Sequence, residues 1–147
     1  FLINKISNLD EQNIKLKIIG RKKFSKNLTK LLNNSEKKTS KNKSLQINLA
    51  LNYGSKNEIV DTINLINKSK KKVTEKNISN HLFTKNIPDP DLLIRTGNTR
   101  RLSNFLLWQI AYSEIFFEKK LWPDFNEIDY NRILKSFKKI KRNFGSI

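Results

Sequence analysis

The chain has 147 residues, a net charge of +17 and no cysteine, so disulfide bonds and cysteine-based metal sites are excluded. The length allows one domain with its own core, and the apolar residues gather in periodic runs that disordered chains lack. The positive charge suits polyanions such as nucleic acid, anionic lipid headgroups or phosphorylated small molecules. It is also what AT-rich coding produces, because Lys, Asn and Ile crowd the whole chain. His81, the single histidine, cannot build a multi-histidine metal site.

The sequence predicts neither a transmembrane helix nor a signal peptide. It has no run of about 18 apolar residues, and the apolar start at residues 1–6 is too short for a leader. The chain opens at Phe1 in the middle of a helical pattern, which suggests a fragment whose N-terminal part is missing.

Segments of helical and of strand character alternate through the first 83 residues. Apolar spacing predicts helices over 1–12, 24–34 and 74–83, and another that follows Ser55 and ends within the basic run 68–72; it also predicts strands over 15–20 and 45–54 and a polar loop over 33–43. Gly20 and Gly54 close the strands, and Ser55 and Thr74 are the expected N-caps of the last two helices. The helix after Ser55 is expected to bury one broad apolar face, which carries Ile59, Val60, Ile63, Leu65 and Ile66.

The second half of the chain predicts one more strand and two more helices. The strand covers residues 91–95, a helix that is apolar nearly all round covers 104–117, and an amphipathic helix covers 124–144. The last helix is expected to face inward with Ile128, Ile133, Leu134, Phe137 and Ile140. Together these elements predict an α/β fold with a mostly parallel sheet flanked by helices. Only three strands are visible, so we expect residues 1–147 to be the incomplete C-terminal part of one domain.

A basic turn follows the strand over 91–95. In parallel α/β sheets, ligands bind at the carboxyl ends of the strands, where this strand delivers Arg95. Arg100 and Arg101 follow within the turn, and Ser103 is expected to begin the next helix. Guanidinium groups and the N–H groups at a helix start both favour phosphate oxygens, so a diphosphate is the expected ligand. A capped helix with surface arginines explains the same spacing equally well.

Glu114 stands out as a carboxylate among aromatic residues. Burying it is costly unless it is paired or bound to a metal. On the predicted helix, Glu114 and Ser103 point the same way but lie roughly 16 Å apart along the axis. One small diphosphate cannot easily contact both, so a shared site would take the two residues from different subunits.

The segment DLLIRTGNTRRLSNFLLWQIAYSEIFFEKKLWPDF closely resembles the C-terminal signature of the cis-prenyltransferases, the undecaprenyl diphosphate synthase family. KLKIIG and LQINLALNYG are similar to middle strands of that family, and FG near the end is similar to its C-terminal region. The resemblance covers essentially the whole chain in order, and it is most specific in the long central segment.

The resemblance implies an isoprenyl transferase. Members condense isopentenyl diphosphate onto an allylic diphosphate to make polyprenyl diphosphates, such as the undecaprenyl diphosphate of the cell-wall lipid carrier. They are Mg²⁺-dependent homodimers, and the implied location is cytoplasmic, with peripheral contact to the membrane that receives the product. The family's isopentenyl diphosphate ligands correspond to Arg95, Arg101 and Ser103, and its Mg²⁺-associated glutamate corresponds to Glu114. We therefore expect this chain to hold the isopentenyl diphosphate half of the site.

Three departures from the family pattern bear on activity. Thr99 and Arg100 stand where many members have Glu–His, and Asn143 replaces a C-terminal arginine thought to reach across the dimer. The family's Asp-Gly-Asn-Gly-Arg segment, with the catalytic aspartate, and its Ser-x-Glu-Asn-Trp segment do not occur in these 147 residues. No catalytic residue is therefore assigned in this chain, and we expect the fragment alone to be inactive.

Two other interpretations stay open. The chain could belong to a partner subunit of a heteromeric cis-prenyltransferase, which lacks the catalytic aspartate but keeps the C-terminal region. The net charge alone would also fit a basic nucleic-acid-binding domain, but no recognised motif and no strand surface with interleaved basic and aromatic residues supports it. We therefore expect no nucleic-acid partner.

Overall fold

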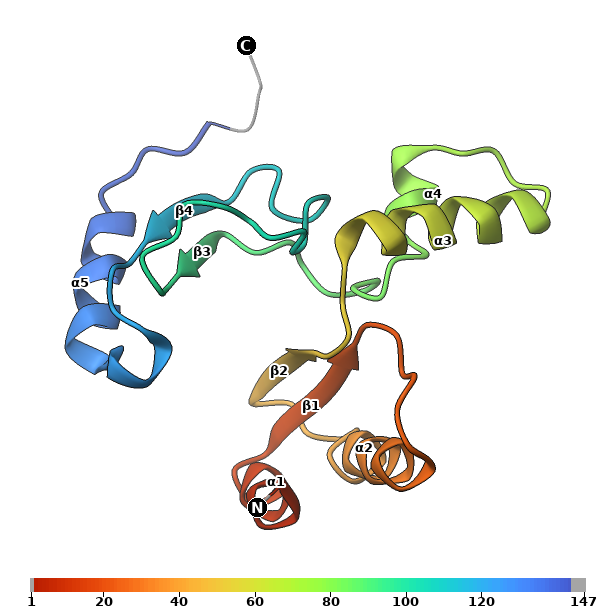
Figure 1. Ribbon diagram of the computed structural model, residues 1–147, viewed down its shortest axis with the longest axis horizontal. Helices are drawn as coiled ribbons and strands as arrows, with labels where there is room; N and C mark the ends of the chain where they lie inside the picture. The colour runs from red at the N-terminus through yellow and green to blue at the C-terminus, as the bar shows by residue number, and fades with distance from the viewer. Residues whose placement is uncertain (1, 144–147) are drawn as a thin grey trace. The chain divides into compact units, whose positions relative to one another are not determined.

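The computed structural model describes residues 2–143, which fall into two compact units, Phe1–Lys85 and Asn86–Ile147 (Figure 1). The first unit contains α1 (Leu2–Glu11), β1 (Ile14–Ile19), α2 (Lys26–Lys38), β2 (Leu45–Ala50), α3 (Ser55–Lys68) and α4 (Glu75–Ser79). β1 and β2 pair in parallel, with Ile14 opposite Leu45 and Ile19 opposite Ala50. No helix within residues 2–143 is both long and apolar enough to cross a membrane.

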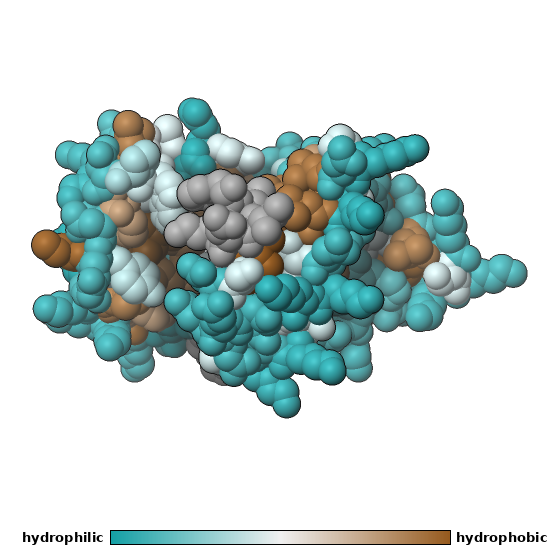
Figure 2. Space-filling model, turned by 90° about the horizontal axis from the view of Figure 1, so that it is seen from below, coloured by the Kyte–Doolittle hydropathy of each residue, from teal (hydrophilic) through white to brown (hydrophobic). Residues whose placement is uncertain are grey.

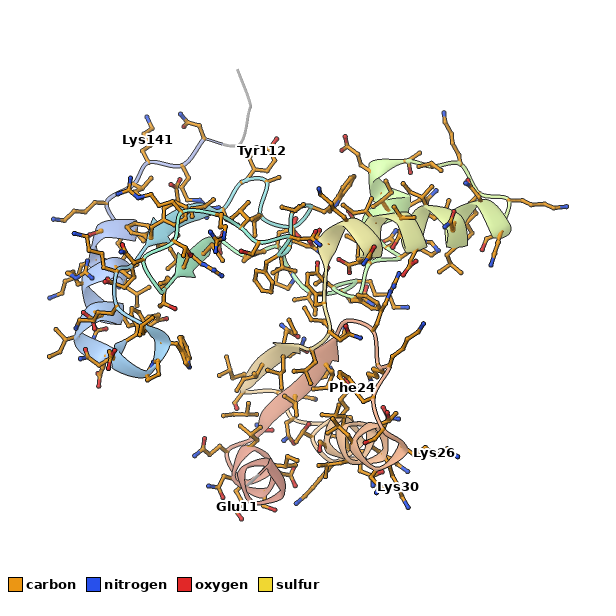
Figure 3. All side chains as sticks on the ribbon, in the orientation of Figure 1. Glu11, Phe24, Lys26, Lys30, Tyr112 and Lys141 are labelled. Carbon is orange, nitrogen blue, oxygen red and sulfur yellow. The ribbon has the colours of Figure 1, made fainter. Side chains whose placement is uncertain are left out.

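The core of the first unit lies between β1 and α2. Leu16 and Ile18 of β1 pack with Leu32 of α2, and the half-buried Phe24 closes the same cluster. Figure 3 shows Phe24 between α2 and the sheet, whereas Lys26 and Lys30 point away from it. The predicted alternation along β2 is present, but Leu45, Ile47 and Leu49 remain 37–56% exposed. The reason is that α1 and α2 contact β1, the neighbouring strand.

α2 is longer than the sequence pattern predicts, and its last turns replace the expected loop from residue 33. Side chains of its last turn and of its C-cap residue, Thr39, bond to the free edge of β1: the backbone N–H of Leu16 donates to Thr39 Oγ1 at 3.0 Å, and that of Ile18 donates to Glu36 Oε1 at 2.8 Å. Polar side chains therefore satisfy strand groups that an edge would otherwise leave unpaired. Helical periodicity could not reveal this, because the contacts are tertiary.

Of the two N-caps predicted from the sequence, the one for α3 is wrong and the one for α4 is confirmed. Gly54 is the N-cap of α3, and Ser55 is a fully buried first residue of the helix rather than its cap. Thr74 does cap α4, accepting a hydrogen bond from the N–H of Asn77 at 3.1 Å. His81, which follows α4, is half-buried.

The buried face of α3 is more polar than predicted. Glu58 is buried because its carboxylate accepts hydrogen bonds from the Tyr53 hydroxyl at 2.5 Å and the Phe83 N–H at 2.7 Å. Of the predicted apolar face, Ile66 is fully buried, while Val60 and Leu65 are half or more exposed. Bonded polar groups thus take core positions that hydrophobicity alone assigns to isoleucine and valine.

The second unit contains β3 (Leu92–Arg95), β4 (Glu114–Phe117), a short 3₁₀ helix (Trp122–Asp124) and α5 (Glu127–Phe137). β3 and β4 pair in parallel, with Leu92 opposite Glu114 and Arg95 opposite Phe117. Both strand pairs of the chain are parallel and flanked by helices, which confirms the predicted α/β class. β4 is a fourth strand that the sequence pattern did not predict.

The predicted helix over 104–117 is wrong. Residues 103–112 form irregular turns, in which Ser103, Asn104 and Leu106 have φ values of +50°, +61° and +46°. Residues in this left-handed region cannot continue an α-helix. The last four residues then pair with β3 as β4. A segment that is apolar on all sides carries no period that separates helix from strand, which explains the error.

α5 is shorter than predicted. Asn126 and Asp129 form a capping box at its start, and the regular helix ends at Phe137. Ile133 is buried as expected, but Ile128, in the first turn, is 79% exposed and does not pack inward. The predicted end at residue 144 lies outside the described residues.

Candidate functional site

The loops that follow β3 and β4 are bonded to each other. The N–H of Gly97 donates to the carbonyl of Lys120 at 2.8 Å, and the N–H of Asn98 donates to the carbonyl of Glu118 at 3.1 Å. Gly97 and Asn98 have φ values of +91° and +54°, a region that glycine and asparagine adopt most readily. The predicted turn after Arg95 is therefore present, at the carboxyl end of a parallel strand pair, where ligands of α/β proteins bind.

Arg95 is half-buried and held within this turn. Its Nε donates to Thr99 Oγ1 at 3.0 Å, and its carbonyl accepts from the N–H of Glu118 at 2.7 Å. The guanidinium is thus oriented before any ligand arrives, with N–H groups left to donate. Sequence reasoning missed this role of Thr99, although a hydroxyl four residues after the arginine, across a Gly-Asn turn, was a usable signal.

Arg101 and Ser103 lie further along the same loop, and both are exposed. Neither Arg100 nor Arg101 forms an ion pair with any part of residues 2–143. No helix begins at Ser103, so the helix N-terminus predicted for the anion site is absent. What the loop offers an anion is one oriented guanidinium, two exposed ones and a hydroxyl.

A network of charged side chains supports the loop after β4. Glu118 accepts from the N–H of Lys120 at 3.1 Å and pairs with Arg132 of α5, while Lys120 pairs with the buried Asp129 at 2.8 Å. The Lys120 N–H, and then Arg132, lower the pKa of Glu118. The ammonium of Lys120, and then the Asn126 N–H, lower the pKa of Asp129.

These lowered pKa values predict acid-sensitive stability. A carboxylate whose pKa falls on folding stabilises the protein above its unfolded pKa, and this contribution is lost as the pH drops through the folded value. Stability should therefore decline below the ordinary values of 4.5 for Glu118 and 3.8 for Asp129. Urea unfolding at pH 3 to 7 would measure this. Glu118→Gln and Asp129→Asn together should flatten the dependence, whereas Asp124→Asn, an exposed control, should not; equal slopes in all three proteins would contradict the prediction.

Glu114 lies away from Arg95 within this unit. It begins β4, whereas Arg95 ends β3, so the two are separated by about 10 Å along the strand direction. Their side chains also leave opposite faces, because Glu114 pairs with Leu92 and side chains alternate along a strand. The helical geometry expected for Glu114 is therefore wrong, and at this separation one small ligand cannot contact both Glu114 and Arg95.

Glu114 alone does not make a metal centre. Residues 2–143 contain no group of three or more His, Cys, Asp or Glu side chains placed to hold one ion. Mg²⁺ commonly binds through only one or two carboxylates and completes its octahedron with phosphate oxygens and water. A half-buried carboxylate fits that use as one ligand among several, with the others coming from substrate or another chain.

The net charge is not concentrated at this loop. Residues 1–85 carry 19 Lys and Arg against 6 Asp and Glu, whereas residues 86–147 carry 11 against 7. The face of the molecule shown in Figure 2 is largely hydrophilic, with separate hydrophobic areas between. Most of the excess positive charge therefore lies in the first unit and not in residues 95–103, which we call the arginine loop.

Comparisons with known proteins find relatives that match nearly the whole chain. A family model described as "Putative undecaprenyl diphosphate synthase" matches residues 1–145. The isoprenyl transferase of Rickettsia typhi is 42% identical over 147 residues, which are 99% of this chain and 65% of that relative. The isoprenyl transferase of Fusobacterium nucleatum is 40% identical over 149 residues, which cover 100% of this chain and 64% of that relative. The chain thus spans somewhat less than two thirds of these relatives.

Two solved structures share the fold. One, from Campylobacter jejuni, is described as a probable undecaprenyl diphosphate synthase; it has a TM-score of 0.89 and 33% identity, covering 99% of this chain and 69% of that one. The other is lavandulyl diphosphate synthase from Lavandula x intermedia in complex with dimethylallyl diphosphate, with a TM-score of 0.90, 34% identity, and coverage of 99% and 67%. On the family match and these likenesses, the chain belongs to the undecaprenyl diphosphate synthase family of prenyltransferases.

Proposed function

We propose that this chain is part of an isoprenyl transferase that condenses isopentenyl diphosphate with an allylic diphosphate to make a polyprenyl diphosphate, and that it holds the isopentenyl diphosphate half of the site. The observation that carries the proposal is the arginine loop at the carboxyl end of β3, in which Thr99 orients Arg95 and Arg101 is exposed. Family membership supports the reaction class, and the complex of the lavender relative with an allylic diphosphate supports the substrate class.

In this proposal the arginine loop binds and orients the nucleophilic substrate. Arg95 and Arg101 donate to the diphosphate oxygens of isopentenyl diphosphate, and the hydroxyl of Ser103 donates a further hydrogen bond. Fixing the diphosphate sets where the substrate's double bond lies relative to the allylic carbon, which loses its own diphosphate as the new bond forms. The isopentenyl unit then releases a proton, which restores a double bond. Because Thr99 already orients Arg95, less conformational entropy is lost on binding.

Glu114 would hold Mg²⁺ in this proposal. The ion, when bound, would neutralise charge on a diphosphate. Since Glu114 and Arg95 lie at opposite ends and on opposite faces of the strand pair, we propose that each site of a homodimer takes Arg95 from one subunit and Glu114 from the other. Three further expectations remain predictions. They are that residues 1–147 belong to a single domain, that the enzyme is cytoplasmic, and that it contacts the membrane peripherally where the product is released.

The test is a condensation assay on the complete protein. Purified protein with Mg²⁺, labelled isopentenyl diphosphate and farnesyl diphosphate should give extractable polyprenyl product without any second protein. Glu114→Gln should raise the Mg²⁺ concentration needed for half-maximal rate by about tenfold, because one carboxylate ligand becomes a neutral amide. Activity that appears only when a separate catalytic subunit is added would replace this function with that of a partner subunit. No product under either condition would overturn both.

A further inference from the structure

The C-terminal segment after α5 returns to the start of the β3–β4 pair through Arg142. Its Nη1 is paired with Asp91 Oδ1 at 2.5 Å, and its Nη2 donates to the carbonyl of Tyr112 at 3.2 Å. The guanidinium carbon also lies 5.7 Å from the centre of the Phe137 ring. One side chain, only 19% exposed, therefore joins the residue before β3, the turn before β4 and the end of α5.

The two residues that Arg142 bonds, Asp91 and Tyr112, lie next to the contacts that place Glu114. The N–H of Glu114 donates to the carbonyl of Asp91 at 3.0 Å, and Ser113 Oγ donates to the carbonyl of Pro90. Tyr112, whose carbonyl Arg142 binds, is two residues before Glu114. Arg142 therefore links the side chain of Asp91, whose backbone carbonyl accepts from Glu114, to the backbone carbonyl of Tyr112, two residues before Glu114.

We propose that Arg142 is a positioning residue for Glu114, fixing where its carboxylate lies for the metal–diphosphate complex; this rests on the metal role proposed above for Glu114. The ion pair by itself contributes little to stability, because Asp91 is 69% exposed and water screens such pairs. The geometric constraint is larger, since a planar guanidinium donates to a carboxylate and a carbonyl in fixed directions. Lysine has rotatable donors on one compact charge and lacks the planar fork, so it cannot hold the carboxylate and the carbonyl in the same fixed directions.

The experiment compares three variants of the complete protein. They are Arg142→Ala, Arg142→Lys and the control Lys141→Ala, which changes the neighbouring residue in the chain, whose exposed side chain points outward in Figure 3. Mg²⁺ titrations of the rate should show a requirement raised about tenfold in Arg142→Ala, an intermediate shift in Arg142→Lys and none in Lys141→Ala. KM for isopentenyl diphosphate at saturating Mg²⁺ should stay within about twofold of wild type, because the arginine loop is untouched.

Hydrogen exchange supplies a readout that does not depend on turnover. The Glu114 amide should exchange faster in Arg142→Ala, because its bond to Asp91 opens more often, and at the wild-type rate in Lys141→Ala. If Glu114→Gln shifts the Mg²⁺ requirement but neither Arg142 variant does, this inference is overturned and the proposed function stands. If Glu114→Gln leaves it unchanged, the metal role and the inference fall together. A loss of folding in Arg142→Ala still leaves Arg142→Lys to decide.

Discussion

Replacing Arg95 by alanine should lower kcat/KM for isopentenyl diphosphate about 100-fold in the complete protein. The variant loses charge-assisted hydrogen bonds to the diphosphate, each worth about 1.5–3 kcal/mol, and every ~1.4 kcal/mol changes the rate constant tenfold. If the contact is as strong in the bound ground state as in the transition state, most of the loss should appear as a raised KM. Arg95 is half-buried, so its removal also leaves Thr99 without its partner in the turn.

Steady-state assays with varied isopentenyl diphosphate and fixed allylic substrate would measure this effect. Lys135→Ala is a matched loss of positive charge on the exposed face of α5 in the same unit, and it should change kcat/KM less than twofold, as roughly expected for a screened surface charge. A decrease of similar size in both variants would mean that net charge, not the loop geometry, attracts the substrate.

Gly20→Ala should destabilise the protein by at least about 3 kcal/mol. Gly20 directly follows β1 with φ +113°, and a Cβ at this position would lie 2.2 Å from the carbonyl oxygen of Leu51. Relief of that clash requires the ends of β1 and β2 to separate, where the Leu51 N–H donates to the Ile19 carbonyl at 3.0 Å. Backbone strain and overpacking therefore add together.

Gly97→Ala is the control that measures the cost of backbone strain alone, without the steric clash. Gly97 has φ +91°, but its nearest neighbour to an added Cβ is Leu121 Cδ2 at 4.0 Å, which is an ordinary contact. Its cost should be about 1–2 kcal/mol, the usual penalty for a left-handed alanine. Chemical denaturation followed by circular dichroism would compare the two variants, and equal losses would show that the approach to Leu51 is not decisive.

The parallel α/β class followed from features that are local in sequence. Short runs such as 15–20 and 91–95 are rich in strand-forming residues, and a glycine closes the first of them and follows shortly after the second. Arg95 could also be placed at a strand end from local sequence, because the direction of the chain alone shows which end of a strand is the carboxyl end. Those expectations survive in β1 and β3.

The errors occurred where distant residues decide the local structure. β4 is a strand because β3 pairs with it from about 20 residues away, and nothing within 104–117 shows that partner. Likewise, Arg142 contacts Asp91 across 51 positions, so its role near Glu114 could not be read from spacing. In the family pattern the departure at this end of the chain is Asn143, while the neighbouring Arg142 contacts Asp91 and Tyr112 within its own unit.

Direct binding of isopentenyl diphosphate is the sharpest test of the half-site. Calorimetric titration of the complete protein, without allylic substrate so that no turnover occurs, should show wild-type binding that weakens about 10- to 100-fold in both Arg95→Ala and Arg101→Ala, with Lys135→Ala unchanged. Unchanged affinity in both arginine variants would contradict the account and remove the arginine loop as the isopentenyl diphosphate site.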